Sequence, residues 1–273
     1  MNKKLIIGIS AAAVAAVIIG AAAALMTSSP PEKIDLSSTH TTEAATEPAK
    51  DTEPETPPAV TTAPETTAAA VENVTASLDT YTFGNISIQF PKVDGISDSK
   101  LQDTINESLR TNALSVIAGY EADEAKDTMT VKCQVLSVDR RSLTAVYTGS
   151  YTPDGGAHPV NLFYSNTMDL RSGSSLGLND FTDSYTMAGY VLSSDVIFSD
   201  LTEEQTAAVL EYRQSLTIEE LTNTFNQADF PIQKGVVWPP SFSYEKQGNI
   251  FFSMPVPHAL GDYVIVCFEP STK

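Results

Sequence analysis

The chain contains few of the residues that metal, redox and nucleic-acid sites require. Its 273 residues include two cysteines, three histidines and one tryptophan. No Cys-x-x-Cys or His-x-x-x-His spacing occurs, so we expect no zinc site, and no other metal or cofactor is predicted. Positive charge is also scarce, with 16 Lys and Arg against 34 Asp and Glu and a formal net charge of −18. A nucleic-acid partner is disfavoured because phosphate contacts need a basic surface, whereas a cationic protein would be attracted.

The first 26 residues predict a membrane segment. Lys3 and Lys4 precede an uncharged apolar run of 22 residues, from Leu5 to Met26, and about 20 apolar residues suffice for a membrane-spanning helix. We interpret residues 1–26 as an uncleaved signal anchor, with a cleaved signal peptide as the alternative because small residues stand near the end of the run. The lysines predict a single-pass protein of a cell membrane with its C-terminal domain outside, or a secreted protein if the signal is cleaved.

Residues 27–74 predict a disordered tether. Thr, Pro, Ala and Glu dominate this segment, which has no aromatic residue. Such a composition buries too little apolar surface to offset the entropy lost on ordering. The segment would hold a folded domain away from the membrane.

Residues 75–273 predict an α+β domain in which flanking helices interrupt a mainly antiparallel sheet. We divide this part into a small β-β-α subdomain at 75–126 and a larger α+β subdomain at 127–273. Alternating patterns and turn residues place strands near 77–83, 85–91, 128–138, 142–151, 160–170, 241–246, 249–255 and 262–269. Helices are expected near 100–118, 203–214 and 218–228, each after a capping-box pair: Ser99 with Gln102, Thr202 with Gln205, and Thr217 with Glu220.

The clearest strand signal lies at 160–170. Apolar and polar residues alternate there with the period of two that is typical of a strand buried on one face. Phe163 and Asn166 break the alternation. We therefore expect a half-buried strand with two irregular positions.

The segment from Tyr151 to Phe181 carries the most specific pattern. After Tyr151 come Gly155-Gly156-Ala157-His158-Pro159, the strand to Leu170, the Ser172-Gly173 turn and Leu176-Gly177-Leu178-Asn179-Asp180-Phe181. This order resembles the extracytoplasmic domain of RsiV-like proteins, known from bacterial anti-sigma factors that sense lysozyme and also found beside peptidoglycan deacetylase modules. The resemblance spans about residues 75–270 and implies a sensing or binding domain.

The pattern departs from that family at both ends. Only Met1 to Lys4 precede the apolar run, and no deacetylase module follows before Lys273. We therefore expect the sensing domain of the family without an anti-sigma segment.

Some residues of the domain are candidates for ligand binding. A histidine in a glycine-rich elbow can bind a ligand or sense pH, and an exposed aromatic ring can mark a glycan or protein surface. The alternative is structural, because glycine permits unusual backbone angles and an imidazole can hydrogen-bond a neighbouring turn. The candidates are Tyr151, Gly155, Gly156, His158, Trp238 and His258.

An enzymatic alternative depends on Ser175. The residues from Gly173 to Gly177 match the Gly-x-Ser-x-Gly pattern, and Asp180 or a later Asp with His258 would complete a Ser-Asp-His order. That motif belongs on a mainly parallel sheet, and a Ser- and Gly-rich turn explains the same residues. We assign no catalytic residue, and Ser175 is the first position to test.

Cys133 and Cys267 each lie in a strand-like run. An exported protein permits a disulfide between them. Cys133 also shares a strand face with Met129, Val131 and Val135, as a small buried hydrophobe would. Both interpretations remain open at this point.

These features together predict a membrane-tethered extracytoplasmic module. Its expected role is to bind or sense peptidoglycan or another cell-wall-related ligand, or a cationic protein such as lysozyme. A cell-envelope hydrolase or accessory enzyme is the alternative from another functional class, and a structural surface protein is the third.

Overall fold

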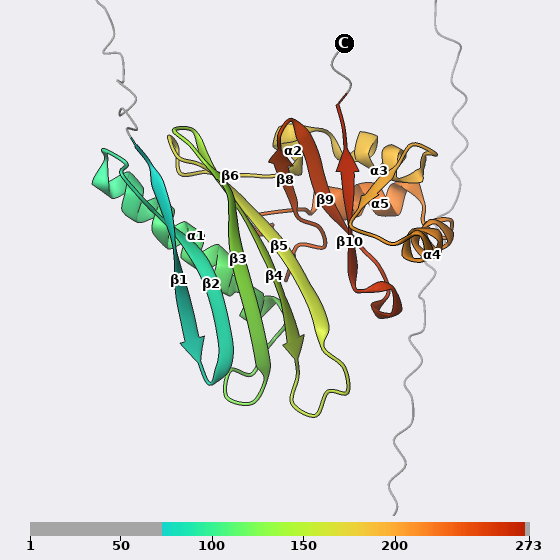
Figure 1. The fold of residues 1–273 in the computed structure, drawn as a ribbon, viewed down its shortest axis with the longest axis horizontal. Coiled ribbons are helices and arrows are strands. Elements are labelled where there is room, and N and C mark those ends of the chain that lie inside the picture. Colours follow the sequence, from blue (N-terminus) through green and yellow to red (C-terminus); the bar gives the residue numbers. More distant parts are fainter. Residues whose placement is uncertain (1–72, 271–273) are drawn as a thin grey trace, which may run out of the picture. The chain divides into compact units, whose positions relative to one another are not determined.

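The computed structural model describes residues 73–270, which form two sheets with helices against them (Figure 1). The α+β class expected from the sequence is confirmed. The predicted signal anchor and nearly all of the predicted tether lie outside the described residues. Among the helices of residues 73–270, none is long and apolar enough to cross a membrane.

The first sheet has six strands in the order β1-β2-β3-β4-β5-β6. Neighbouring strands are antiparallel except β2 and β3, which are parallel. A parallel pair needs a crossover connection, and helix α1 (Ser99–Gly119) supplies it. The strands are β1 (Thr75–Phe83), β2 (Asn85–Asp94), β3 (Thr128–Val138), β4 (Ser142–Thr152), β5 (Val160–Asp169) and β6 (Ser175–Leu176).

Helix α1 buries one apolar face against this sheet. Its buried positions are Ile105, Leu109, Ala113 and Val116, at the spacing of three or four residues that aligns side chains on one helix face. The Tyr164 hydroxyl of β5 donates to the Ala113 carbonyl at 2.9 Å, so the helix and the strand are also joined by a buried hydrogen bond.

The predicted cap of α1 is wrong by one residue. The cap is Asp98, whose Oδ1 accepts from the backbone N–H groups of Lys100 at 2.9 Å and Leu101 at 3.2 Å. The side chain of Gln102 instead accepts from the Ile96 backbone N–H at 3.0 Å. A carboxylate is a stronger acceptor than a hydroxyl and is favoured by the positive end of the helix dipole, so Asp98 replaces Ser99 in this role.

Strand β5 is buried on both faces, which corrects the expectation of a half-buried strand. Leu162, Tyr164 and Met168 belong to the core under α1, while Ser165 and Thr167 on the opposite face are buried as well. The reason is a second layer over that face, because the Ser165 hydroxyl donates to the Ser243 carbonyl of strand β8 at 2.7 Å.

The second sheet has four antiparallel strands in the order β7-β10-β9-β8. These are β7 (Ile197–Ser199), β8 (Ser243–Lys246), β9 (Asn249–Pro255) and β10 (Tyr263–Phe268). The helices of this part are α2 (Leu178–Phe181), α3 (Ser184–Leu192), α4 (Glu203–Arg213) and α5 (Ile218–Asn226), with the 3-10 turn η1 (His258–Leu260). Both predicted capping boxes of α4 and α5 are confirmed.

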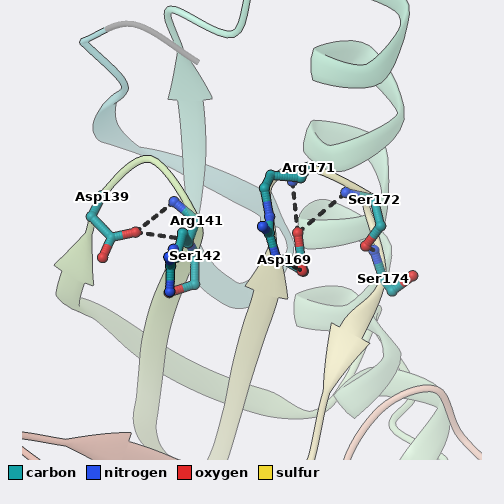
Figure 2. Close-up of polar contacts among 7 residues, drawn as sticks. All are labelled: Asp139, Arg141, Ser142, Asp169, Arg171, Ser172 and Ser174. Carbon is teal, nitrogen blue, oxygen red and sulfur yellow. Dashed lines mark hydrogen bonds and ion pairs between the residues drawn. The ribbon is translucent and has the colours of Figure 1, made fainter. Parts of the chain in front are cut away.

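The β3–β4 and β5–β6 connections contain the same Asp-x-Arg-Ser sequence, at residues 139–142 and 169–172 (Figure 2). In each, one Asp oxygen accepts from the backbone N–H groups of the Arg and the Ser. The distances are 2.6 and 2.9 Å for Asp139 and 2.7 and 3.2 Å for Asp169. Side-chain acceptors of this kind fix tight turns. The first set of bonds holds the pKa of Asp139 below its usual value.

A buried carboxyl joins α2 to β8. Asp229 accepts hydrogen bonds from the Leu178 backbone N–H at 2.8 Å and from the Ser243 backbone N–H and hydroxyl, both at 2.6 Å. The side chain is buried. It therefore fixes the position of the loop between α5 and β8, which also carries Trp238.

Candidate functional site

Asp262 connects two loops that are about 100 residues apart in sequence. One carboxylate oxygen accepts from the Asn161 backbone N–H at 2.7 Å and from its side-chain amide at 3.1 Å. The other oxygen lies 2.8 Å from Nδ1 of His258. Because Asn161 is at the start of β5 and Asp262 precedes β10, these bonds join the first sheet to the β9–β10 connection.

A cleft opens beside Asp262, and we call it the aromatic cleft. Its volume is about 200 Å³, less than the roughly 300–1,000 Å³ of sites for drug-sized ligands. The ring centres of Phe163 and Tyr263 are 5.1 Å apart, and those of Tyr120 and Trp238 are 6.1 Å apart. The cleft is lined by Tyr120, Asn161, Phe163, Trp238, Pro239, Pro240, Phe242, Ser253, Pro255, Asp262 and Tyr263. It has room for one long side chain or one sugar ring.

Asp262 supplies the negative charge of the aromatic cleft. Its side chain is 15% exposed. Burial and then the nearby Asp262 charge raise the pKa of Tyr120, and the same two causes raise the pKa of Tyr263. Both hydroxyls therefore stay neutral at pH 7. Aromatic faces beside one carboxylate attract an ammonium or guanidinium group.

Trp238, a predicted binding residue, does line the cleft. It is half-buried, with its ring centre 5.1 Å from that of Phe242 and 5.4 Å from that of Tyr164. A Cβ at Gly119 would lie 2.5 Å from the Trp238 ring, so glycine at the end of α1 is required for this packing. The indole is thus held by the core while its edge reaches the cleft.

Tyr151, another predicted binding residue, has a structural role. It is buried, and its hydroxyl donates to Asp127 at 2.9 Å. Asp127 also accepts from the Asp154 and Asp123 backbone N–H groups at 2.7 and 2.8 Å. These bonds, that of Asp154 first, lower the pKa of Asp127. Tyr151 contacts the ring of Tyr120 at 5.6 Å and so supports the cleft from behind.

The glycine-rich elbow is an exposed loop. Gly155 has a φ of 75°, and Gly156 donates its N–H to the Pro153 carbonyl at 2.8 Å, so both glycines serve the turn, as their structural interpretation required. The loop brings His158 to His258, with ring centres 6.2 Å apart. Both predicted histidines are exposed and neither lines the aromatic cleft; His258 contacts Asp262, and His158 lies beside His258.

Ser175 and His258 are not brought together. Ser175 pairs with Met168 near the end of β5, whereas His258 contacts Asp262, which is bound to Asn161 at the start of that strand. Met168 follows Asn161 by seven positions in one strand, a distance of about 23 Å. Ser175 lies on an antiparallel strand and its hydroxyl accepts from the Asn112 amide at 3.4 Å. This geometry contains no Ser175–His258 dyad.

Cys133 and Cys267 do not form a disulfide, so the structure agrees with their interpretation as small buried hydrophobic residues. Cys133 and Cys267 are free and buried, one in the six-stranded sheet and the other in the four-stranded sheet. Burial raises the pKa of Cys133 to about 12. A thiol with such a pKa is unreactive at neutral pH.

Sequence reasoning missed Asp262 and the aromatic residues around it. Asn161, Phe163 and Tyr263 were recognised only as strand positions, and Tyr120 lies just beyond the helix expected near 100–118. The one available signal was Gly261-Asp262, a polar pair directly before an apolar strand. Within residues 73–270 no group of three or more His, Cys, Asp or Glu is placed to hold a metal ion.

The chain is thus an α+β domain whose surface carries a cleft lined by aromatic rings and one carboxylate. No family model and no curated protein matches the chain. The solved structures that are similar to it include two of DUF3298 family proteins. That from Bacteroides fragilis NCTC 9343 has 15% identity and a TM-score of 0.36, covering 74% of this chain and 91% of that chain. That from Pseudomonas aeruginosa PAO1 has 13% identity and a TM-score of 0.30, covering 67% and 84%.

Proposed function

We propose that the chain is a binding module that recognises a cationic protein through the aromatic cleft. The observation that carries the proposal is the carboxylate of Asp262 beside the rings of Tyr120 and Tyr263. A lysine or arginine side chain entering the cleft meets both the negative charge and the aromatic faces. The net charge of −18 would steer such a partner to the surface.

The module would act outside the cell membrane. Residues 1–26 would anchor the chain and residues 27–74 would extend the domain outward, as the sequence patterns predict. In this position the domain senses cationic proteins that reach the bacterial surface, of which lysozyme is the test case.

A cell-wall glycan is the second candidate ligand. The ring of Tyr263 offers a stacking surface for a sugar ring, the edge of Trp238 adds an apolar contact, and the Asn161 amide can hydrogen-bond the sugar hydroxyls. This ligand would depend on the rings more than on the charge of Asp262, which makes the two candidates separable.

Calorimetric titration of the purified full chain tests both candidates. We expect saturable binding of lysozyme that weakens as salt is raised from 50 to 300 mM, because the attraction is between charges. Asp262→Asn keeps the side-chain volume and removes the charge, and we expect it to weaken lysozyme binding about tenfold. Asp195→Asn, at an exposed carboxylate outside the cleft, is the matched control and should bind like the parent chain.

The outcomes are distinct. No heat with lysozyme refutes the proposal, as does equal weakening by Asp262→Asn and Asp195→Asn. Binding of soluble peptidoglycan fragments without salt dependence, together with no lysozyme binding, would favour the glycan instead.

A further inference from the structure

His158 and His258 form an exposed pair that the proposed function does not use. They come from the β4–β5 loop and the β9–β10 connection, and their ring centres are 6.2 Å apart with an angle of 36° between the ring planes. The side chain of His258 is 54% exposed. Within residues 73–270, the ring of His158 has no hydrogen-bond partner. Two histidines that are 100 residues apart in sequence are thus placed together, and of their ring nitrogens Nδ1 of His258 is occupied, by Asp262.

The separation of the rings fits a shared metal ion. In an imidazole, each nitrogen is roughly 1.2 Å from the ring centre, and a zinc–nitrogen bond is about 2.0–2.1 Å long. Two rings on one ion can therefore have centres up to about 6.5 Å apart, and a tetrahedral angle places them at about 5.3 Å. The observed 6.2 Å lies inside this range, and a movement of about 1 Å in two exposed side chains reaches the tetrahedral value.

Asp262 orients one of the two rings. Its carboxylate lies 2.8 Å from Nδ1 of His258, and it is itself held by the two hydrogen bonds from Asn161. A carboxylate on one imidazole nitrogen fixes the tautomer and leaves the other nitrogen as a lone-pair donor, which is the usual arrangement of a metal-ligating histidine. The same bonds also hold the two loops together, so the pair is positioned by the fold.

From these observations we propose that His158 and His258 bind one divalent transition-metal ion of the zinc and copper class. Neutral imidazoles suit these ions, and the acidic surface raises the local concentration of cations. The pair supplies two ligands, and water or a group of a bound partner fills the remaining positions. A site with two protein ligands on the surface is open and exchangeable, unlike a closed structural zinc site.

Calorimetric titration of the full chain with Zn²⁺ tests the proposal. We expect one ion per chain and at least a tenfold loss of affinity in His158→Ala and in His258→Ala. His40→Ala, which changes the third histidine of the chain, is the matched control and should leave the affinity unchanged. Far-UV circular dichroism shows whether each variant keeps its fold, which we expect because both rings lie in exposed loops.

Electron paramagnetic resonance with Cu²⁺ gives a second readout that does not depend on affinity. Two imidazole nitrogens should couple to the copper in the parent chain and one in each single variant. Absence of saturable Zn²⁺ binding, or equal binding by the double variant His158→Ala/His258→Ala and the parent chain, would overturn the proposal. Neither ring lines the aromatic cleft, and the copper spectrum reports the metal ligands directly, so this result can be read without lysozyme.

Discussion

The buried carboxyl of Asp229 makes the stability of the domain depend on pH in a direction opposite to that of most acidic residues. Burial raises the pKa of Asp229 to about 7, against a usual value of 3.8, although three hydrogen bonds from Leu178 and Ser243 favour the charged form. Desolvation therefore outweighs the hydrogen bonds.

The direction and size of this pH dependence follow from the difference in proton binding between the folded and the unfolded chain. The folded chain binds a proton at Asp229 over a pH range in which the unfolded chain has lost it, so stability falls as the pH rises from about 4 to about 7. A shift of about 3 pKa units corresponds to about 4 kcal/mol at most. Of this, about 3 kcal/mol should be lost between pH 5 and pH 8.

Urea unfolding of the parent chain and of Asp229→Asn at pH 5, 6, 7 and 8 measures this loss. The amide does not titrate, so the free energy of unfolding of the parent chain should fall by about 3 kcal/mol relative to that of Asp229→Asn across this range. Asp94→Asn changes an exposed carboxyl and is the matched control. Its unfolding free energy should remain within about 0.5 kcal/mol of that of the parent chain at each pH.

A constant difference between the parent chain and Asp229→Asn from pH 5 to pH 8 would refute the reasoning. It would mean that the three hydrogen bonds offset the desolvation of the carboxylate, so that Asp229 is charged in the folded chain throughout.

Three further predictions concern the packing, the helix cap and the thiols. Gly149→Ala should destabilise the domain by at least about 2 kcal/mol in urea unfolding, because a Cβ there would lie 2.1 Å from a backbone oxygen of β3. Asp98→Ala should cost about 1 kcal/mol of stability by thermal denaturation and Ser99→Ala much less, since Asp98 is the cap of α1; equal costs would contradict the assignment. Cys133 and Cys267 should react with a thiol reagent only after denaturant is added, because both are buried and burial raises both pKa values; labelling of the folded chain would contradict this.

Local sequence patterns predicted most of the elements of this protein. The caps of α4 and α5 were found from the spacing of Thr202 with Gln205 and of Thr217 with Glu220, since a capping box is made by residues that are close in the chain. Helix α3 and strand β7, with 9 and 3 residues, were not predicted. Strand β7 is too short to carry a sequence pattern. Helix α3 is as long as α5 but lacks a capping-box pair, since its cap Asp183 only accepts from the Thr186 N–H.

The candidate site was predicted in part. Trp238 and the two histidines were selected by residue type; Trp238 lines the aromatic cleft, His258 contacts its lining residue Asp262, and His158 lies beside His258. Tyr151 has the same residue type as Tyr263, yet one is buried against Asp127 and the other lines the cleft. Residue type alone does not distinguish them, because exposure depends on which strand face a second layer covers.

The sequence by itself determined the acidic charge, the positions of most strands and helices, and the turns that glycine and proline impose, because these depend on composition and on neighbours within a few residues. Only the tertiary structure decided that β5 is buried on both faces and that Asp262 meets Asn161. Contacts between residues that are about 100 positions apart depend on strand order and register. These are set by the packing of the whole domain, and no local pattern contains them.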